Sequence, residues 1–160
     1  MTCLRAVTGP EDSAEALDIY LSNPDYFTLV GNPCPTLSDI AQDAAALPPG
    51  AKLEQKLYRL FGSGEGLIDL ILDYPAPGEA FIGLFLVHGR LHRQGRGSRL
   101  IREIEEWLKE QGCKRLRLAV IEGNDGALAF WKSLGFEETD RFTAQMQSGP
   151  MEAVRMAKAI

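Results

Sequence analysis

The spacing of apolar residues has a helical period in the first third of the chain. Apolar residues recur at intervals of three and four in 10–21 and in 36–47, so both segments are predicted to be helices. The next proline is expected to end the first helix, and Ser38 is the expected cap of the second. The segment after the first helix, residues 22–27, is predicted to be a turn.

Further along, apolar residues alternate with polar ones or form short runs between turns rich in glycine and proline. This pattern is typical of antiparallel strands joined by short connections. The helical period returns after Gly97 and again before Gly135, which predicts helices over 98–111 and 123–136. The predicted strands are 3–7, a run within 52–61, 66–75, 80–89, 114–121, 141–146 and 153–160. With no repeat, linker or low-complexity tract, the pattern predicts one α+β domain over residues 1–160.

Composition and charge narrow the class of protein. The chain has 17 basic and 22 acidic side chains, a net charge of −5, which disfavours nucleic acid as a partner. No apolar run is long enough for a membrane span and the first residues do not resemble a secretory signal, so a cytoplasmic protein is expected. The cysteines are too scattered for a disulfide framework or a metal site, so no metal is expected and all three are interpreted as packing residues: Cys3, Cys34 and Cys113.

A cluster of arginines interrupts this acidic chain. Five arginines, at every third position from Arg90 to Arg102, surround Gly95 and Gly97. The cluster follows an apolar strand and precedes an amphipathic helix, so the glycines and the free N–H groups of the first helical turn would suit a phosphate. Arginine donors complement such a group. The same spacing is also typical of a solvated helix face, and the loop by itself leaves both interpretations open.

A second motif favours the phosphate interpretation. HRQGRG, residues 92–97, is followed after one helix and one strand by NDGALAFWKSLGF, residues 124–136. The order and separation of the two motifs resemble the signature of the GNAT superfamily of acyl-CoA-dependent N-acyltransferases. The resemblance implies a mixed, mainly antiparallel central sheet with flanking helices and a splayed strand pair, here 81–87 and 114–121.

The resemblance also implies a cosubstrate and the residues that bind it. Acetyl-CoA would place its pyrophosphate on the backbone of the loop and its pantetheine arm between the splayed strands, as an added strand. Asn124 would bond the arm, and the motif helix would line the thioester end. The residues implied in coenzyme binding are Phe85, Leu86, Val87, His92, Arg93, Gln94, Gly95, Arg96, Gly97, Ser98, Asn124, Ala127, Phe130 and Trp131.

The chain departs from the family pattern at three positions. Arg96 stands where an apolar residue is usual, so its side chain is expected at a coenzyme phosphate or in solvent. Arg93 replaces a usual glycine. Trp131 occupies the position at which many relatives carry a tyrosine that protonates the leaving thiolate, and an indole cannot act as that acid. Packing in the core is the other role open to Trp131.

The general base and the acceptor site are less well defined. A carboxylate, or water held by one, must take a proton from the amine. The candidates are Glu122 after the splayed strand, and Asp69 and Asp73, which are four apart and expected on one face of a strand. The family's acceptor site lies between the first helices and the central strands, and acids there favour a cationic acceptor. The residues expected at this site are Asp25, Tyr26 and Phe27.

These observations predict an enzyme that moves an acetyl group from acetyl-CoA to a primary amine of a small molecule or peptide, by direct transfer in a ternary complex. No cysteine lies beside a histidine in the sequence, so no covalent step is expected. One alternative is a non-catalytic acyl-CoA-binding regulatory module, favoured by Trp131 and by the lack of an obvious base. Another is a protein that binds the phosphates of a different nucleotide. A monomer or homodimer with no nucleic-acid or membrane partner is expected.

Overall fold

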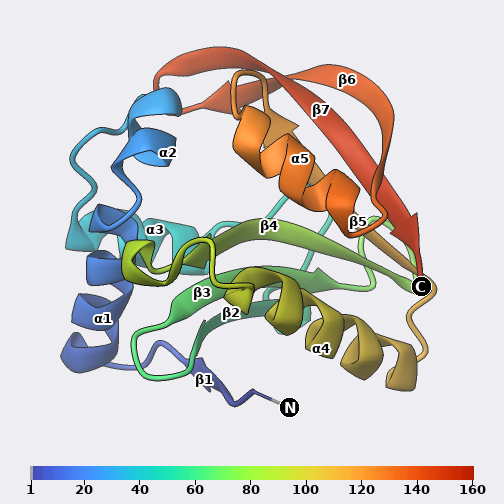
Figure 1. Cartoon of the computed structure of the whole chain (residues 1–160), viewed down its shortest axis with the longest axis horizontal. Helices are drawn as coiled ribbons and strands as arrows, with labels where there is room; N and C mark the ends of the chain where they lie inside the picture. Colours follow the sequence, from blue (N-terminus) through green and yellow to red (C-terminus); the bar gives the residue numbers. More distant parts are fainter. Residues whose placement is uncertain (1) are drawn as a thin grey trace.

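Seven strands form one sheet in the part of the chain that the structure, a computed structural model, describes, which is residues 2–160 (Figure 1). Their bounds are β1 (Leu4–Ala6), β2 (Lys56–Phe61), β3 (Gly66–Leu72), β4 (Glu79–Val87), β5 (Arg115–Ile121), β6 (Glu137–Met146) and β7 (Gly149–Ala159). They lie in the order β1-β2-β3-β4-β5-β7-β6. Within these residues only β4 and β5 pair in parallel, so the predicted mixed, mainly antiparallel sheet is confirmed.

Helices cover both faces of the sheet and enclose two separate cores. One face carries α4 (Arg96–Glu110) and α5 (Asp125–Ser133), which Figure 1 shows in front of the strands. The other face carries α1 (Pro10–Leu21), α2 (Pro24–Leu29) and α3 (Leu37–Ala45). Two single turns of 3-10 helix, Leu53–Gln55 and Gly89–Leu91, precede β2 and follow β4. Among residues 2–160, no helix combines the length and the apolar character that a membrane crossing requires.

The alternation of side chains along the central strands assigns each apolar residue to one of these two cores. Leu60 and Leu67 pack with α1 to α3, whereas their neighbours Phe61 and Ile68 pack with α4 and α5. This is the period of two that places successive strand residues on opposite faces of a sheet. Because both faces are covered, the central strands are apolar on both sides.

The segment after α1 differs from the predicted turn, because Pro24 begins a helix and does not merely end one. Pro24 is the first residue of α2, where its missing N–H costs nothing and its fixed φ suits the helix. Phe27 is buried on this short helix and stacks on Tyr20 of α1, with ring centroids 4.7 Å apart. Packing against α1 therefore stabilises a helix that local sequence did not predict.

Four smaller predictions also need correction. The first residue of α4 is Arg96, not Ser98. The cap of α3 is Thr36, not Ser38; its backbone N–H and hydroxyl both donate to Asp39, at 2.7 and 3.2 Å. The last two strands begin earlier than predicted. The packing role predicted for all three cysteines holds only for Cys113, because Cys3 and Cys34 are exposed.

Candidate functional site

The parallel pair β4 and β5 separates halfway along its length. Their pairing runs from Glu79 with Arg115 to Ile82 with Leu118 and then stops. Both strands continue beyond that point, β4 to Val87 and β5 to Ile121, without facing backbone partners from each other. The splayed strand pair predicted from the family resemblance is therefore confirmed.

A bulge in β4 lies at the point of separation. Asp69 of β3 is opposite Leu84, but the next residue, Leu70, is opposite Ile82, which leaves Gly83 as the extra residue. A Cβ on Gly83 would lie 2.9 Å from Oδ2 of Asp69, closer than real Cβ contacts permit. A larger residue at this bulge would therefore have to displace the Asp69 carboxylate.

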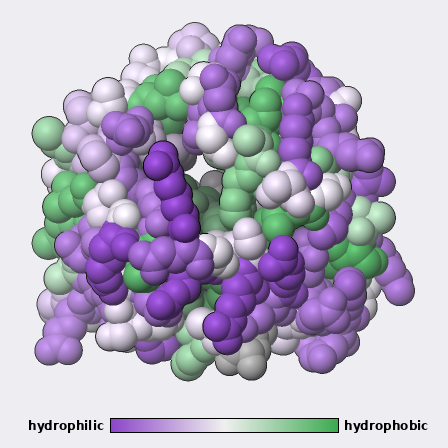
Figure 2. Space-filling model, viewed as in Figure 1, coloured by the Kyte–Doolittle hydropathy of each residue, from purple (hydrophilic) through white to green (hydrophobic). Residues whose placement is uncertain are grey.

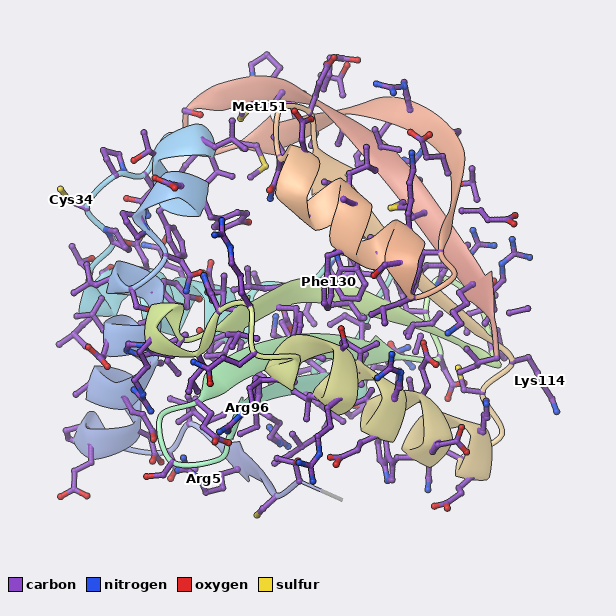
Figure 3. The ribbon with its side chains drawn as sticks, viewed as in Figure 1. Arg5, Cys34, Arg96, Lys114, Phe130 and Met151 are labelled. Carbon is purple, nitrogen blue, oxygen red and sulfur yellow. The ribbon has the colours of Figure 1, made fainter. Side chains whose placement is uncertain are left out.

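The gap contains a cavity of about 90 Å³, which we call the splay cavity. An aromatic cluster forms part of its wall: the Trp131 ring lies 5.7 Å from Phe85 and 4.9 Å from Phe130. Trp131 is only 7% exposed, so it packs in the α4 and α5 core and also lines the cavity. Figure 3 shows Phe130 extending from α5 toward β4. The residues that line the cavity are Tyr26, Ile82, Gly83, Leu84, Phe85, Leu118, Ala119, Val120, Ile121, Asn124, Ala127 and Trp131.

The loop before α4 presents a helix N-terminus that no side chain caps. Gly95 is the N-cap residue with φ of 74°, and the first helical turn contains no acid. The amides of this turn and the helix dipole therefore favour an anion. Arg93 has φ of 61°, a left-handed conformation that glycine adopts without strain. Glycine, which the family pattern would place here, would adopt this conformation more readily than arginine.

Two side chains of this loop contact the protein. Arg96 Nη1 pairs with Oε1 of Glu65, and the Arg96 side chain is still 45% exposed, so it lies at the surface with a carboxylate partner. Gln94 Nε2 donates to the carbonyl of Arg90 at 3.1 Å. Arg93 and Arg99 are also exposed beside the backbone amides.

The end of β4 is fixed by two side chains. The Val87 carbonyl accepts hydrogen bonds from Asn23 Nδ2 at 3.1 Å and from His92 Nε2 at 2.8 Å, which requires the proton of neutral His92 to be on Nε2. Of the three β4 residues predicted to bond a pantetheine arm, Val87 therefore already has its carbonyl engaged. On the opposite wall, Asn124 caps α5, accepting from the Ala127 N–H at 3.3 Å, and lines the splay cavity.

The three candidate bases have different surroundings. Asp69 is on β3 with its side chain 14% exposed, and its Oδ2 accepts from Lys56 Nζ at 3.0 Å. Burial raises the pKa of Asp69, and the ion pair with Lys56 opposes that rise. Asp73 does not share a strand face with Asp69, because β3 ends at Leu72 and Asp73 accepts from the Gly78 N–H in a turn. Glu122 is exposed beyond the end of β5 and does not line the splay cavity.

A second cavity, of about 290 Å³, adjoins the first and lies beside α3; we call it the α3 cavity. Tyr26 and Leu84 line both cavities. Figure 2 shows the molecule hollowed in this region, above β4 and between α2 and α5. The remaining residues that line the α3 cavity are Phe27, Val30, Asn32, Asp39, Gln42, Asp43, Ala46, Gln145, Met146 and Gln147.

The acids that line the α3 cavity do not include Asp25, the acid predicted for the acceptor site. Asp25 is exposed in the first turn of α2 and lines neither cavity, whereas Tyr26 and Phe27 do lie at this site. Burial raises the pKa of Tyr26 to about 12. The acids at the cavity are Asp39 and Asp43, four residues apart on α3. This spacing, which puts two acids on one helix face, was visible in the sequence and could have identified them.

Comparisons with known proteins give the same class as the geometry. The chain is 24% identical to an acetyltransferase from Thermus thermophilus whose structure is solved, over 100% of this chain and 97% of that one, with a TM-score of 0.77. That likeness supports the fold. The chain is also 37% identical over 62 residues to an aminoglycoside N(6')-acetyltransferase type 1 of Serratia marcescens. It is 40% identical over 45 residues to a thialysine N-epsilon-acetyltransferase of Bos taurus.

These matched segments cover 39% and 28% of this chain, and only 42% and 26% of the two relatives. The model of the acetyltransferase (GNAT) family matches residues 38–136, more than half of the chain. The fold and the family model thus place the chain among proteins of the acetyltransferase class. The chain belongs to the GNAT family, whose acetyltransferases use acetyl-CoA as cosubstrate.

Proposed function

We propose that this protein, as a single domain over residues 1–160, transfers an acetyl group from acetyl-CoA to a primary amine in a ternary complex. The observation that carries the proposal is the end of β4 and β5 pairing after Ile82 and Leu118, which opens a cavity beside the motif residues of α5. Both relatives are named as N-acetyltransferases, which transfer the acetyl group to a nitrogen atom. A small-molecule or peptide acceptor fits the proposal, since a further hollow of about 750 Å³ shares Leu118 and Ala119 with the splay cavity.

The residues of the site fit the coenzyme. The uncapped start of α4 offers backbone amides for a pyrophosphate. The unpaired halves of β4 and β5 offer strand edges to an extended arm, and Asn124 and Ala127 border its path. When bound, acetyl-CoA supplies an already activated thioester. The protein then contributes position, and it excludes water with the aromatic wall of Phe130 and Trp131.

The transfer forms a C–N bond and breaks the C–S bond, so the amine nitrogen must lose a proton and the leaving sulfur must gain one. We assign the loss to Asp69 acting through water, because its carboxylate lies against Gly83, a residue of the splay cavity. Its raised pKa suits a proton acceptor that works near neutral pH. Trp131 cannot supply the proton to sulfur, so the sulfur takes it from water, and the proton accepted by Asp69 returns to the solvent.

The test is release of free thiol from acetyl-CoA in the presence of a panel of primary amines and short peptides. Asp69→Asn should lower kcat strongly, since general base catalysis typically contributes about 10²- to 10⁴-fold. The matched control is Glu122→Gln at the exposed end of β5, which should leave kcat within about twofold of the parent. Equal effects of the two substitutions would remove Asp69 from this role.

One observation favours a second candidate, the non-catalytic acyl-CoA-binding module: Trp131 stands at the position of the usual acid and is packed among aromatic rings. Binding of coenzyme A, measured by calorimetry, without thiol release from acetyl-CoA in any amine mixture would support that candidate. A melting-temperature rise with ATP or NAD and none with coenzyme A would instead favour a site for another nucleotide.

A further inference from the structure

We propose that Asp43 binds a second, protonated amino group of the acceptor, so that the acceptor is a diamine or a larger molecule with two amino groups. The inference rests on the proposed N-acetyltransfer and names the substrate class for that site. It starts from the α3 cavity, which shares the lining residues Tyr26 and Leu84 with the splay cavity. A molecule that reaches the thioester from this side has its other end in the α3 cavity.

The lining of the α3 cavity suits a cation. Its two charged side chains within the described residues are Asp39 and Asp43, and no lysine, arginine or histidine lines it. The remaining surface is apolar or neutral, from residues such as Phe27, Leu84 and Met146. Partial enclosure strengthens the attraction between a carboxylate and an ammonium group relative to open solvent. An anionic acceptor would find no basic partner there.

Asp43 and Asp39 differ in what already binds them. Asp39 accepts from the backbone N–H and the hydroxyl of Thr36 and so is engaged in capping α3. The hydrogen bond from the Thr36 backbone lowers the pKa of Asp39. Asp43 Oδ2 accepts a single hydrogen bond, from the Tyr20 hydroxyl at 2.7 Å. Asp43 is therefore the carboxylate that retains capacity for a ligand.

A buried hydroxyl chain fixes the orientation of Asp43. Tyr20 is fully buried, and its hydroxyl lies 2.7 Å from that of Tyr58, so the two phenols and the carboxylate form one connected network. With Tyr20 donating to Asp43, Tyr58 must donate to Tyr20. Because the hydrogen bond from Tyr20 already fixes this carboxylate, its other oxygen can bind a ligand with little further loss of side-chain entropy. Tyr20 is accordingly a positioning residue.

The charges around Asp43 leave room for one more cation. Lys56 of β2 is the basic group whose charge reaches Asp43, but its ammonium already binds Asp69 and the carbonyl of Ala46. Burial raises the pKa of Asp43, while the Tyr20 hydrogen bond and Lys56 oppose the rise. The titratable groups that face Asp43 from the surrounding elements are Tyr20, Tyr26, Asp39, Lys56, Tyr58 and Asp69.

The amine that reacts cannot be the one that Asp43 holds. A nucleophilic nitrogen must be neutral, whereas an ion pair with a carboxylate keeps an amine protonated. The reacting nitrogen also has to reach the splay cavity at Gly83 and Phe85, and Asp43 does not line that cavity. Two amino groups divide these tasks: one is acetylated at the splay, and the other remains charged on Asp43.

The experiment compares linear diamines with the monoamines of the same carbon chain. For the parent protein, kcat/KM should be at least about tenfold higher for the best diamine, because a hydrogen bond to a charged group is worth about 1.5–3 kcal/mol. Asp43→Asn keeps the shape and the Tyr20 contact but should remove this preference, by raising KM for the diamine toward that for the monoamine. Exposed Glu54→Gln is the control for the loss of one negative charge.

Calorimetric titration of the best diamine into protein saturated with coenzyme A measures the same interaction without turnover. Lost binding in Asp43→Asn, with binding retained in Glu54→Gln, would support the proposal even if thiol release failed throughout. Diamine binding or preference that survives Asp43→Asn would overturn it. Equal kcat/KM for diamines and monoamines in the parent, with thiol release intact, would overturn it and leave the proposed function standing.

Tyr20→Phe provides a test of positioning. Without the Tyr20 hydrogen bond, which lowers the pKa of Asp43, that carboxylate should protonate at a higher pH. The acid limb of diamine binding should therefore move upward in pH relative to the parent, and the monoamine profile should not move. A uniform loss of activity with an unmoved acid limb would show that Tyr20 only supports the fold, and would remove its positioning role.

Discussion

The two faces of the sheet meet at the same gap between β4 and β5 but contribute different kinds of groups to it. On the α4 and α5 face, backbone features dominate: an uncapped helix start and, at the gap, two unpaired strand edges. On the α1 to α3 face, side chains dominate, linked as Asp43 to Tyr20 to Tyr58 and as Lys56 to Asp69. Backbone groups suit the cosubstrate that we propose, whereas side chains change by mutation, so we expect the second face to set specificity.

The largest expected effect is on the side-chain face. Lys56→Met would leave Asp69 as a buried charge without a partner, and should lower the free energy of unfolding by about 3–5 kcal/mol. Without Lys56 the pKa of Asp69 rises further above its unfolded value, so the penalty is present at pH 8 and shrinks as the pH falls and the carboxyl protonates. Urea unfolding at pH 8 and pH 5 measures it. Exposed Lys114→Met is the control, and an equal loss in both variants would contradict the prediction.

The second effect tests the backbone face. A Cβ on Gly97 would lie 3.3 Å from the Phe130 ring and 3.4 Å from Val87, so Gly97→Val should displace Phe130, which packs on Trp131 of the cavity wall. Overpacking of this kind costs about 1–3 kcal/mol of folding stability. Because the same substitution disturbs the start of α4, we also expect it to weaken coenzyme binding by about tenfold or more. Coenzyme A titration by calorimetry would measure it. Gly126→Val is the matched control, since Gly126 is also the second residue of its helix but faces open space; comparable losses would show that the helix, not the packing, is responsible.

The third prediction returns to the side-chain face. Asp39→Asn weakens the cap of α3 and should lower the free energy of unfolding by about 1 kcal/mol at pH 7. The folded-state pKa of Asp39 is depressed, so this stabilisation is present above its unfolded pKa and is lost as the pH falls through the folded value. The free energies of unfolding of the parent and of Asp39→Asn, measured by denaturation, should thus differ at pH 7, and this difference should disappear toward about pH 3. A difference that persists unchanged would mean that the carboxylate charge does not support the cap.

The smallest expected effect is on the backbone face. Arg93→Gly removes a non-glycine residue from a left-handed conformation, and should raise the free energy of unfolding by up to about 1 kcal/mol. Coenzyme affinity should remain within about twofold if the backbone alone forms the phosphate site. Thermal unfolding measures the change in stability, and calorimetric titration of coenzyme A measures the affinity. A large fall in coenzyme affinity would instead show that the Arg93 side chain binds a phosphate. The α4 and α5 face would then also bind its ligand through a side chain.

Prediction from the sequence also succeeded to different degrees on the two faces of the sheet. The splay, the glycine loop and the position of Asn124 were predicted because motifs record backbone geometry at fixed spacing. The acids at the α3 cavity were misplaced, because their position depends on how α2 and α3 pack on the sheet. Pro24 was interpreted as a helix end, since nothing local shows that Phe27 will stack on Tyr20. Likewise, Arg96 pairs with Glu65, a residue 31 positions earlier, which no local pattern indicates.

The tip of the β6 and β7 hairpin closes the α3 cavity from the far end of the chain. Ser148 donates to the Val30 carbonyl across 118 positions of sequence, and Met146 and Gln147 complete the wall opposite α3. Bringing such distant segments together costs loop-closure entropy, which the contacts they make must offset. The wall of the α3 cavity is therefore completed only when segments 118 positions apart have come together.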